Sequence, residues 1–318
     1  MRGVTVKSTP TTRRPPFVCV YGPPKCGKTG DGLMSFPGCA VFAGDPGAVK
    51  NANQLCGLVE GVDFTVHYAK GLADAAKACN QLLKSGKKPT AIIFDDFTRL
   101  VEQRFADLEK TTTGFALFGH IRDDVIETRD MLRDARIPAI VNTWERAAKI
   151  RGGLLSKGGP MLQGDLPEKF PGICDLVVRA VNDPDAPGDF KGQYQCEPSH
   201  PTYIMGDRDH VAPKLGPMNL GEILRAGGYV VPRLPAIAAD QEELVQLLAD
   251  ALMEGDGEDD ELLARAVAMR AAKKGWKAAH IRLTLRDGRD RYLIRKALAD
   301  RDSVDGIVGS LFSSDALG

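Results

Sequence analysis

One segment near the N-terminus has the residue types and the spacing of a phosphate-binding loop. It reads GPPKCGKT over residues 22–29, which fits the pattern GxxxxGK[ST], and it directly follows the apolar run FVCVYG. Glycines at these positions let backbone N–H groups turn towards phosphate oxygens, and a helix that begins there adds the positive end of its dipole. Lys28 would reach the β- and γ-phosphates, and the Thr29 hydroxyl would bind magnesium. An ordinary glycine-rich turn is the alternative, and the preceding strand pattern disfavours it.

This segment therefore predicts a site for ATP with Mg²⁺. The residues expected to bind the nucleotide are those of the motif and the glycine that follows it, namely Gly22, Pro23, Pro24, Lys25, Cys26, Gly27, Lys28, Thr29 and Gly30.

Two carboxylates follow a second apolar run, AIIF at residues 91–94. In parallel α/β sheets, ligands bind at the carboxyl ends of the strands, so a carboxylate at such an end is well placed to act on a ligand. Asp95 would hold the magnesium shell through water, next to Thr29. Asp96 is either the cap of the following helix or a second catalytic carboxylate, and capping is the favoured interpretation.

A third acidic residue, Asp45, follows the apolar run CAVFAG. Hydrolysis of a triphosphate needs a group that orients or deprotonates water beside the γ-phosphate, and the end of this strand is a suitable place for one. The same residue begins the tripeptide Asp-Pro-Gly, which is typical of turns. The local sequence supports the two roles about equally.

These motifs need a scaffold, and the hydrophobic pattern predicts one. Apolar runs indicate buried strands at 17–22, 38–47, 91–94 and 137–144. Helical spacing of apolar residues indicates helices at 71–84, 97–109 and 119–135. Further strands are expected at 175–181, 193–198 and 201–208, with a long mobile loop at 145–174. Strands that alternate with helices predict an α/β fold with a mostly parallel, doubly wound sheet.

Length and composition set the wider limits. The chain has 318 residues, of which 43% are hydrophobic and 26% charged, so it can bury a core and is not globally disordered. Its 42 basic and 42 acidic residues cancel, so the chain as a whole is not a polycation. No apolar run approaches the ~18 residues of a membrane span. The seven cysteines form no CxxC or metal-ligand pattern. We expect a cytoplasmic protein without a membrane partner.

The order of the motifs resembles the core of RecA-like ATPases over about residues 17 to 226. It comprises the P-loop, a short helix ended by FPG, a strand ending in an acid, the AIIFD strand and a strand ending in Asn-Thr. More narrowly, the chain is similar to phage-encoded RecA-like ATPases of the single-strand annealing and recombination type. The resemblance implies a RecA-like P-loop fold with a twisted sheet, ATP and Mg²⁺ as cofactors, and a homo-oligomer with the nucleotide at the subunit interface.

The resemblance also assigns roles to individual residues. It makes Asp45 the catalytic carboxylate, beside Lys28 and Asp95, and Asn142 or Thr143 the sensor of the γ-phosphate. Arg208, in the segment YIMGDRDHVAP, would reach the nucleotide of a neighbouring subunit. A loop at about 146–172 would bind single-stranded DNA, with basic contacts from Arg146, Lys149, Arg151, Lys157 and Lys169.

Four residues depart from the family pattern. Gly206 stands where the family usually has Lys, so one of two cationic contacts is missing, and Asp45 is one methylene shorter than the usual Glu. Gly30 and Gly32 weaken the helix after the P-loop, each by up to ~1 kcal/mol relative to Ala. These departures favour nucleotide binding over fast hydrolysis.

Four segments are expected along the chain. Residues 1–16 would form a flexible basic arm, 17–231 the RecA-like core, 232–261 a linker with a helix and an acidic hinge, and 262–318 a basic helical region. Between Ala264 and Arg301 there are twelve Lys and Arg against three Asp, a local net charge of +9. This region either binds single strands through charge and its aromatic rings, or is a small helical domain with the rings inside.

The resulting hypothesis is a P-loop ATPase, slow or DNA-stimulated, that binds single-stranded DNA in phage recombination, annealing or replication. A phage or host recombination or replication protein is the expected partner. The alternatives are an annealing module that binds ATP without significant hydrolysis, a helicase or helicase loader, and a small-molecule phosphotransferase. No Arg-rich lid segment lies between the AIIFD strand and the next strand, which argues against the phosphotransferase.

Overall fold

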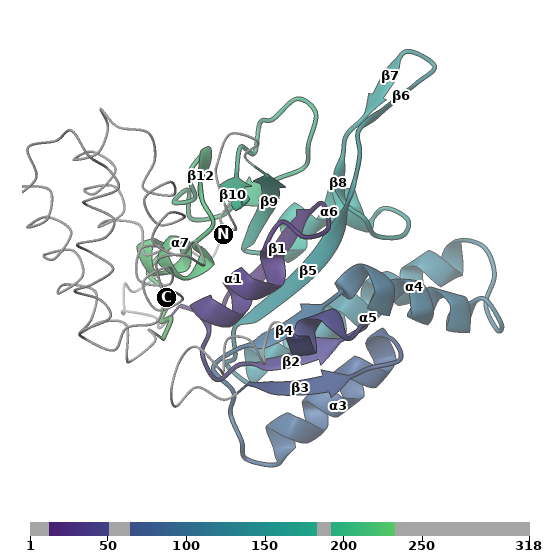
Figure 1. The fold of residues 1–318 in the computed structure, drawn as a ribbon. Helices are drawn as coiled ribbons and strands as arrows, with labels where there is room; N and C mark the ends of the chain where they lie inside the picture. The colour runs from purple at the N-terminus through teal and green to yellow at the C-terminus, as the bar shows by residue number, and fades with distance from the viewer. Residues whose placement is uncertain (1–12, 51–63, 183–191, 233–318) are drawn as a thin grey trace, which may run out of the picture.

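The described residues form a mixed α/β fold around one large sheet (Figure 1). The computed structural model describes residues 13–50, 64–182 and 192–232. The predicted linker, acidic hinge and basic C-terminal region therefore lie outside the described residues, as do the first twelve residues of the predicted N-terminal arm. The main path of the sheet has the strand order β12-β10-β9-β1-β5-β4-β2-β3, with β11 paired to β9 and β8 paired to β5.

The centre of the sheet is parallel. Its strands are β1 (Phe17–Gly22), β2 (Ala40–Ala43), β3 (Thr65–Tyr68), β4 (Ile92–Asp95), β5 (Ala139–Arg146) and β9 (Leu176–Asn182). Short antiparallel strands extend it, namely β8 (Gly159–Pro160), β10 (Gly192–Gln195), β11 (Gly206–Asp207) and β12 (Leu215–Pro217). This confirms the predicted α/β class with a mostly parallel sheet.

The strand register brings the predicted motifs to one edge of the sheet. Val20 pairs with Asn142, Phe94 with Val141, and Ala43 with Asp95. The P-loop, the Asp45 turn, Asp95 and the end of β5 therefore all lie at the carboxyl ends of parallel strands. This is the edge where ligands bind in open α/β sheets.

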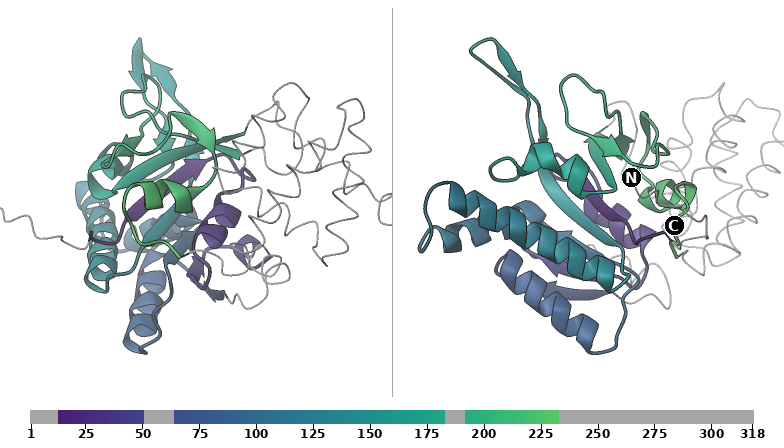
Figure 2. Two further views of the ribbon diagram at one scale, coloured as in Figure 1. Left: turned by 90° about the vertical axis from the view of Figure 1, so that its left-hand side faces the viewer. Right: turned by 180° about the vertical axis from the view of Figure 1, so that it is seen from behind.

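Helices cover both faces of the sheet (Figures 1 and 2). On one face, α1 (Lys28–Ser35) packs against α7 (Leu220–Ala226). On the other lie α4 (Phe97–Leu108), α5 (Phe115–Asp134) and α6 (Leu166–Ile173), and α3 (Leu72–Lys84) packs against α4 and α5. Among the described residues, no helix combines the length and the hydrophobicity that crossing a bilayer would require.

The prediction of a long mobile loop at 145–174 is wrong. Strands β6 (Lys149–Arg151) and β7 (Leu154–Ser156) form an antiparallel hairpin that projects from the body in Figures 1 and 2, and β8 and α6 follow it. Gly152 and Gly153 close this hairpin with φ angles of 55° and 80°, a conformation that favours glycine because it has no Cβ. We call residues 149–156 the β6–β7 hairpin.

One other prediction needs correction. The strand expected over 201–208 is only Gly206–Asp207, because the Asp207 carboxylate accepts the N–H groups of Asp209, Val211 and Ala212 and so turns the chain. Arg13, near the end of the predicted N-terminal arm, forms an ion pair with Asp209 at 2.6 Å. That end of the arm therefore contacts the core.

Candidate nucleotide site

The backbone of the P-loop depends on two glycines. Gly27 caps α1 with φ 94°, a left-handed conformation that glycine adopts without a steric penalty. Gly22 lies so close to β9 that a Cβ built on it would be 2.3 Å from the carbonyl oxygen of Ala180. A side chain at Gly22 would therefore push the loop away from the sheet.

Lys28 lies across its own loop. Its Nζ donates to the carbonyl oxygens of Gly22 (3.0 Å) and Pro23 (2.8 Å) and lies 3.6 Å from the Sγ of Cys26. Pro24 and Lys25 are exposed at the tip of the loop, whereas Cys26 is buried. The ammonium group is thus held inside the turn formed by the residues that were predicted to surround a phosphate.

Thr29, Asp95 and Asn142 meet at the carboxyl edge of the sheet. The Thr29 hydroxyl donates to one oxygen of Asp95 at 2.7 Å, and the Asn142 Nδ2 donates to the other at 3.1 Å. Burial raises the pKa of Asp95, the two hydrogen bonds oppose that rise, and the charge of Asp45 adds to it. Asp95 forms no ion pair with any described residue.

These residues suit a magnesium ion. Hydroxyl and carboxylate oxygens are the donors that Mg²⁺ prefers. The Oδ1 of Asn142 is buried and has no hydrogen-bond partner among the described residues. The site therefore contains a hydrogen-bond acceptor that a bound water or ligand can satisfy. The other predicted sensor, Thr143, is buried, and its hydroxyl has no hydrogen-bond partner among the described residues.

Asp96 is a helix cap, as predicted. It is the N-cap of α4, and its Oδ1 accepts the N–H of Thr98 at 2.9 Å. Burial, with a smaller contribution from the charge of Asp95, raises the pKa of Asp96 to about 6. The Thr98 hydroxyl in turn accepts the N–H of Trp144 at 2.9 Å and ties the start of α4 to the end of β5.

Asp45 forms a turn next to this site. Its Oδ1 accepts the N–H of Gly47 at 2.7 Å, which is the turn role that the Asp-Pro-Gly sequence predicts. The preceding residue, Gly44, donates its N–H to the carbonyl oxygen of Asp95 at 2.8 Å, so the two strand ends are joined. The catalytic role of Asp45 stays a prediction.

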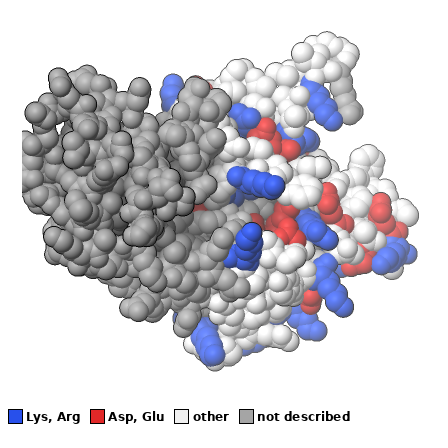
Figure 3. Space-filling view, in the orientation of Figure 1, with Lys and Arg blue, Asp and Glu red and all other residues white. Residues whose placement is uncertain are grey.

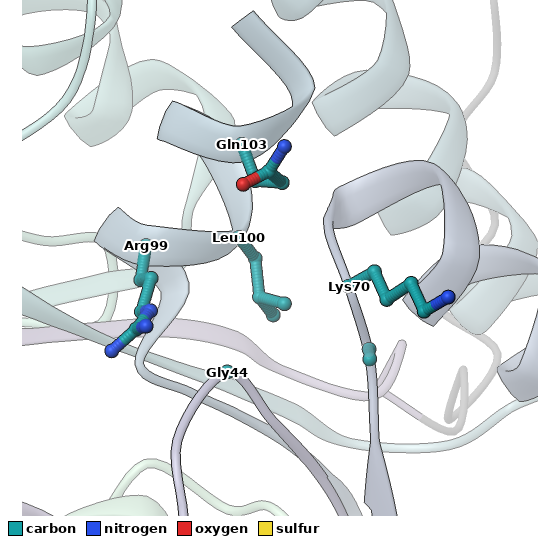
Figure 4. Close-up of a pocket in the computed structure, with 6 residues that line it drawn as sticks. Gly44, Lys70, Arg99, Leu100 and Gln103 are labelled. Carbon is teal, nitrogen blue, oxygen red and sulfur yellow. The ribbon is translucent and has the colours of Figure 1, made fainter. Parts of the chain in front are cut away.

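A pocket of about 320 Å³ opens beside Gly44, the residue before Asp45 (Figure 4). Two cationic side chains and one amide border it, and Leu100 forms part of its wall. Its lining residues are Gly44, Ala69, Lys70, Arg99, Leu100 and Gln103. The pocket belongs to the ends of β2 and β3 and the start of α4, and no P-loop residue lines it.

The five residues predicted to contact DNA fall into two groups. Arg146 donates to Glu168 and to the Lys157 carbonyl, Lys157 donates to the His200 carbonyl, and Lys169 is paired with Asp165. Lys149 and Arg151 instead lie on the β6–β7 hairpin, where Ile150 and Leu154 are 76% and 78% exposed. Among the described residues on the face shown in Figure 3, basic side chains are interspersed with acidic ones and form no continuous basic surface.

Arg208 lies at the opposite edge of the sheet from the P-loop. It pairs with Asp175 at 2.8 Å, and Asp175 also accepts the N–H of Phe17, the first residue of β1. The P-loop begins at the other end of this strand, five residues on and roughly 17 Å away at about 3.3 Å per residue. Arg208 therefore cannot reach the nucleotide site of its own chain.

Two residues that support the P-loop helix escaped the sequence analysis. The buried Asp31 carboxylate accepts the Tyr194 hydroxyl and the N–H of Leu220, and the Ser35 hydroxyl accepts the N–H of Gly221 at 2.9 Å. Both side chains come from α1, and they satisfy the first N–H groups of α7. Their spacing of four residues places them on one face of a helix, which is a signal that the sequence contained.

Comparison with known proteins adds little to this geometry. No protein-family model matches the sequence, and no curated protein matches it. Among solved structures, a crystal structure of the RadB recombinase matches over 56% of this chain and 78% of its own chain, with 17% sequence identity and a TM-score of 0.37. At that level of similarity the match carries no argument about function, and the assignment of the site rests on its residues.

Proposed function

We propose that this protein is an ATP- and Mg²⁺-binding RecA-like P-loop ATPase of the cytoplasm that acts on single-stranded DNA. The observation that carries the proposal is the meeting of Thr29, Asp95 and Asn142 beside a P-loop whose lysine points into the loop. These groups come from the start of α1, the end of β4 and the middle of β5. Their convergence supports a built site rather than an accidental glycine-rich turn.

Each residue of the site has a separate task in this proposal. The Lys28 ammonium exchanges its carbonyl partners for the β- and γ-phosphate oxygens of ATP. The Thr29 hydroxyl and the Asp95 carboxylate hold the ion, which when bound neutralises the charge that develops on the phosphates. Asn142 orients Asp95 through its Nδ2, and its unsatisfied Oδ1 is free to accept from a water near the γ-phosphate.

Asp45 is the proposed catalytic carboxylate. It is close enough to raise the pKa of Asp95, and its second oxygen, Oδ2, is not used in the turn with Gly47. That oxygen would orient the water that attacks the γ-phosphate. The short side chain and the turn also favour a second candidate, a protein that binds ATP and anneals DNA without significant hydrolysis.

Single-stranded DNA is the proposed ligand of the β6–β7 hairpin. Lys149 has no ion-pair partner among the described residues, so it would be available to contact a phosphate. Arg151 lies on the same strand. Arg146, Lys157 and Lys169 already have partners in the protein, so they would contribute less. A phage recombination or replication process is the proposed setting, with a helicase or helicase loader as a near relative.

One experiment tests the proposal as a whole. We expect phosphate release from ATP to need Mg²⁺ and to rise when poly(dT) is added, whereas Lys28→Ala should remove both nucleotide affinity and turnover. Lys110→Ala is a matched control, because Lys110 is an exposed lysine outside the predicted site that pairs only with Asp107. Unchanged ATP affinity in a folded Lys28→Ala protein would overturn the P-loop assignment. Binding of ATP and DNA without phosphate release would select the annealing module.

A further inference from the structure

The base of the β6–β7 hairpin is held by one side chain of the sheet, Arg179 of β9. Its Nε and Nη2 donate to the two carboxylate oxygens of Glu145 at 2.9 and 3.0 Å. Glu145 lies near the end of β5, just before the outgoing leg of the hairpin, and both side chains are mostly buried, at 19% and 14% exposed. Two parallel hydrogen bonds fix the direction of the carboxylate as well as its distance.

The same guanidinium contacts the returning leg through Tyr203. Its carbon lies 3.6 Å from the centroid of the Tyr203 ring. That ring rests directly on the chain that comes back from the hairpin, since a Cβ built on Gly158 would be 2.6 Å from it. Backbone hydrogen bonds join Gly158 to Thr202 and Ile204 on either side of the ring, at 2.8 and 2.9 Å. Arg179 is thus linked to both legs.

This arrangement also borders the nucleotide site. Arg179 pairs across the sheet with Tyr21, the residue before the P-loop glycine Gly22, and Glu145 comes three residues after Asn142. The buried Tyr21 hydroxyl has no hydrogen-bond partner among the described residues, and the charges of Arg179 and Glu145 act on it. A shift of β1 or β5 at the carboxyl edge of the sheet would therefore change the geometry of the hydrogen bonds between Arg179 and Glu145.

We propose that Arg179 is a positioning residue that fixes the β6–β7 hairpin relative to the nucleotide site and so couples DNA binding to ATP turnover. The inference rests on the proposed function, because it concerns the same reaction. The hydrogen bonds of Arg179 go to Glu145 and to Gln195 of β10, and its ring contact goes to Tyr203. Its loss should therefore spare the basal reaction and remove the response to DNA.

The test uses Arg179→Lys, which keeps the positive charge but lacks the planar fork that binds a carboxylate through two hydrogen bonds. We expect basal ATP turnover to stay near the wild-type rate, while the stimulation by poly(dT) falls about tenfold, a usual size for coupling between two sites. Arg122→Lys is the matched control, since Arg122 pairs with Asp123 on the exposed surface of α5. The control should leave both rates unchanged.

A second readout needs no activity. Hydrogen exchange of the backbone amides at 145–160 should become faster in Arg179→Lys, in the absence of nucleotide and DNA, because both legs lose their common contact. Tyr203→Phe keeps the ring and should behave as the wild type in exchange and in stimulation. Tyr203→Leu removes the ring and should behave as Arg179→Lys.

The outcomes separate three cases. Equal loss of basal and stimulated turnover in Arg179→Lys would make the residue a general structural support and overturn the proposal. Faster exchange with full stimulation would overturn the coupling role as well. Failure of the proposed function would be seen in the wild-type protein. If poly(dT) does not stimulate ATP turnover in the wild type, DNA binding and turnover are not coupled, and the proposed role of Arg179 is overturned as well.

Discussion

Two aspartates, the half-buried Asp95 and the buried Asp175, stand at opposite edges of the same sheet, and they are held in different ways. Asp95, at the carboxyl edge, accepts from a hydroxyl and an amide, which are both neutral donors. Asp175, at the amino edge, accepts from Arg133 at 2.9 and 3.2 Å, from Arg208 and from the N–H of Phe17.

The difference separates a structural charge from a functional one. A buried carboxylate that two guanidinium groups neutralise has its counter-charge inside the fold, and it joins the elements that supply the arginines. A half-buried carboxylate whose hydrogen-bond partners are neutral still lacks an ion-pair partner, and an arriving cation can provide one. Asp175 therefore belongs to the stability of the fold, whereas Asp95 has the surroundings of a metal ligand.

The largest expected effect is on stability at the amino edge. Asp175→Ala leaves Arg133, which is mostly buried, without its partner, so we expect the free energy of unfolding to fall by about 3–5 kcal/mol. Urea denaturation followed by circular dichroism measures this. A loss below about 1 kcal/mol would show that Asp175 is no more than an ordinary surface partner.

A smaller effect, and one of a different kind, is expected at Asp95. Because burial raises its pKa, the charged form is disfavoured in the fold, and Asp95→Asn should leave the free energy of unfolding unchanged or higher. The same variant should weaken Mg²⁺-dependent ATP binding on the order of tenfold or more. Calorimetry with and without Mg²⁺ tests this pair of results, and a destabilised Asp95→Asn protein would remove the contrast between the two edges.

Arg208→Ala should change stability by less than about 1 kcal/mol, because its side chain is 54% exposed and Asp175 keeps Arg133. If Arg208 acts on the nucleotide of a neighbouring chain, the variant should still bind ATP and lose most of its DNA-stimulated turnover. Mixing it with Lys28→Ala protein should restore part of that turnover, since one type of mixed interface has both residues. If the two proteins demonstrably co-assemble and turnover is still not restored, the only role left for Arg208 is its ion pair with Asp175.

The smallest change in stability is expected at Asp45. Asparagine forms the same turn with a following N–H, so Asp45→Asn should fold and bind ATP as the wild type does. Only the rate of phosphate release should fall, because the amide cannot act as a base. If Asp45→Asn releases phosphate at the wild-type rate in a single-turnover assay, Asp45 has only the turn-forming role.

The buried strands and the nucleotide edge were predictable, because local signals specify them. Short apolar runs that end in Gly22 and Asp95 identify the strands. Asp96 directly precedes the apolar pattern of α4, which is the position of an N-cap residue. The β6–β7 hairpin was missed because its strands are short and exposed, so the alternation of buried residues that marks a strand is absent. Its Gly152–Gly153 turn was the available signal.

Contacts between distant parts of the chain were not predictable in the same way. The pair of Arg179 with Glu145 joins residues 34 positions apart, and Asp31 reaches Leu220 across 189 positions. Nothing in the local pattern of either residue reveals its partner. Such pairs depend on the completed sheet, which brings β9 beside β1 and α7 beside α1.

The contact between α1 and α7 has a consequence for the order in which the protein is made. A ribosome releases the P-loop helix, with the Asp31 carboxylate on it, almost two hundred residues before the Leu220 N–H that this carboxylate accepts. During that interval the Asp31 carboxylate lacks the partner that it has in the folded protein. Because so long a segment must close, the contact between α1 and α7 forms slowly. Within the described core, the helix after the P-loop is therefore the first helix to be made, and its contact with α7 forms only when the last described helix has been made.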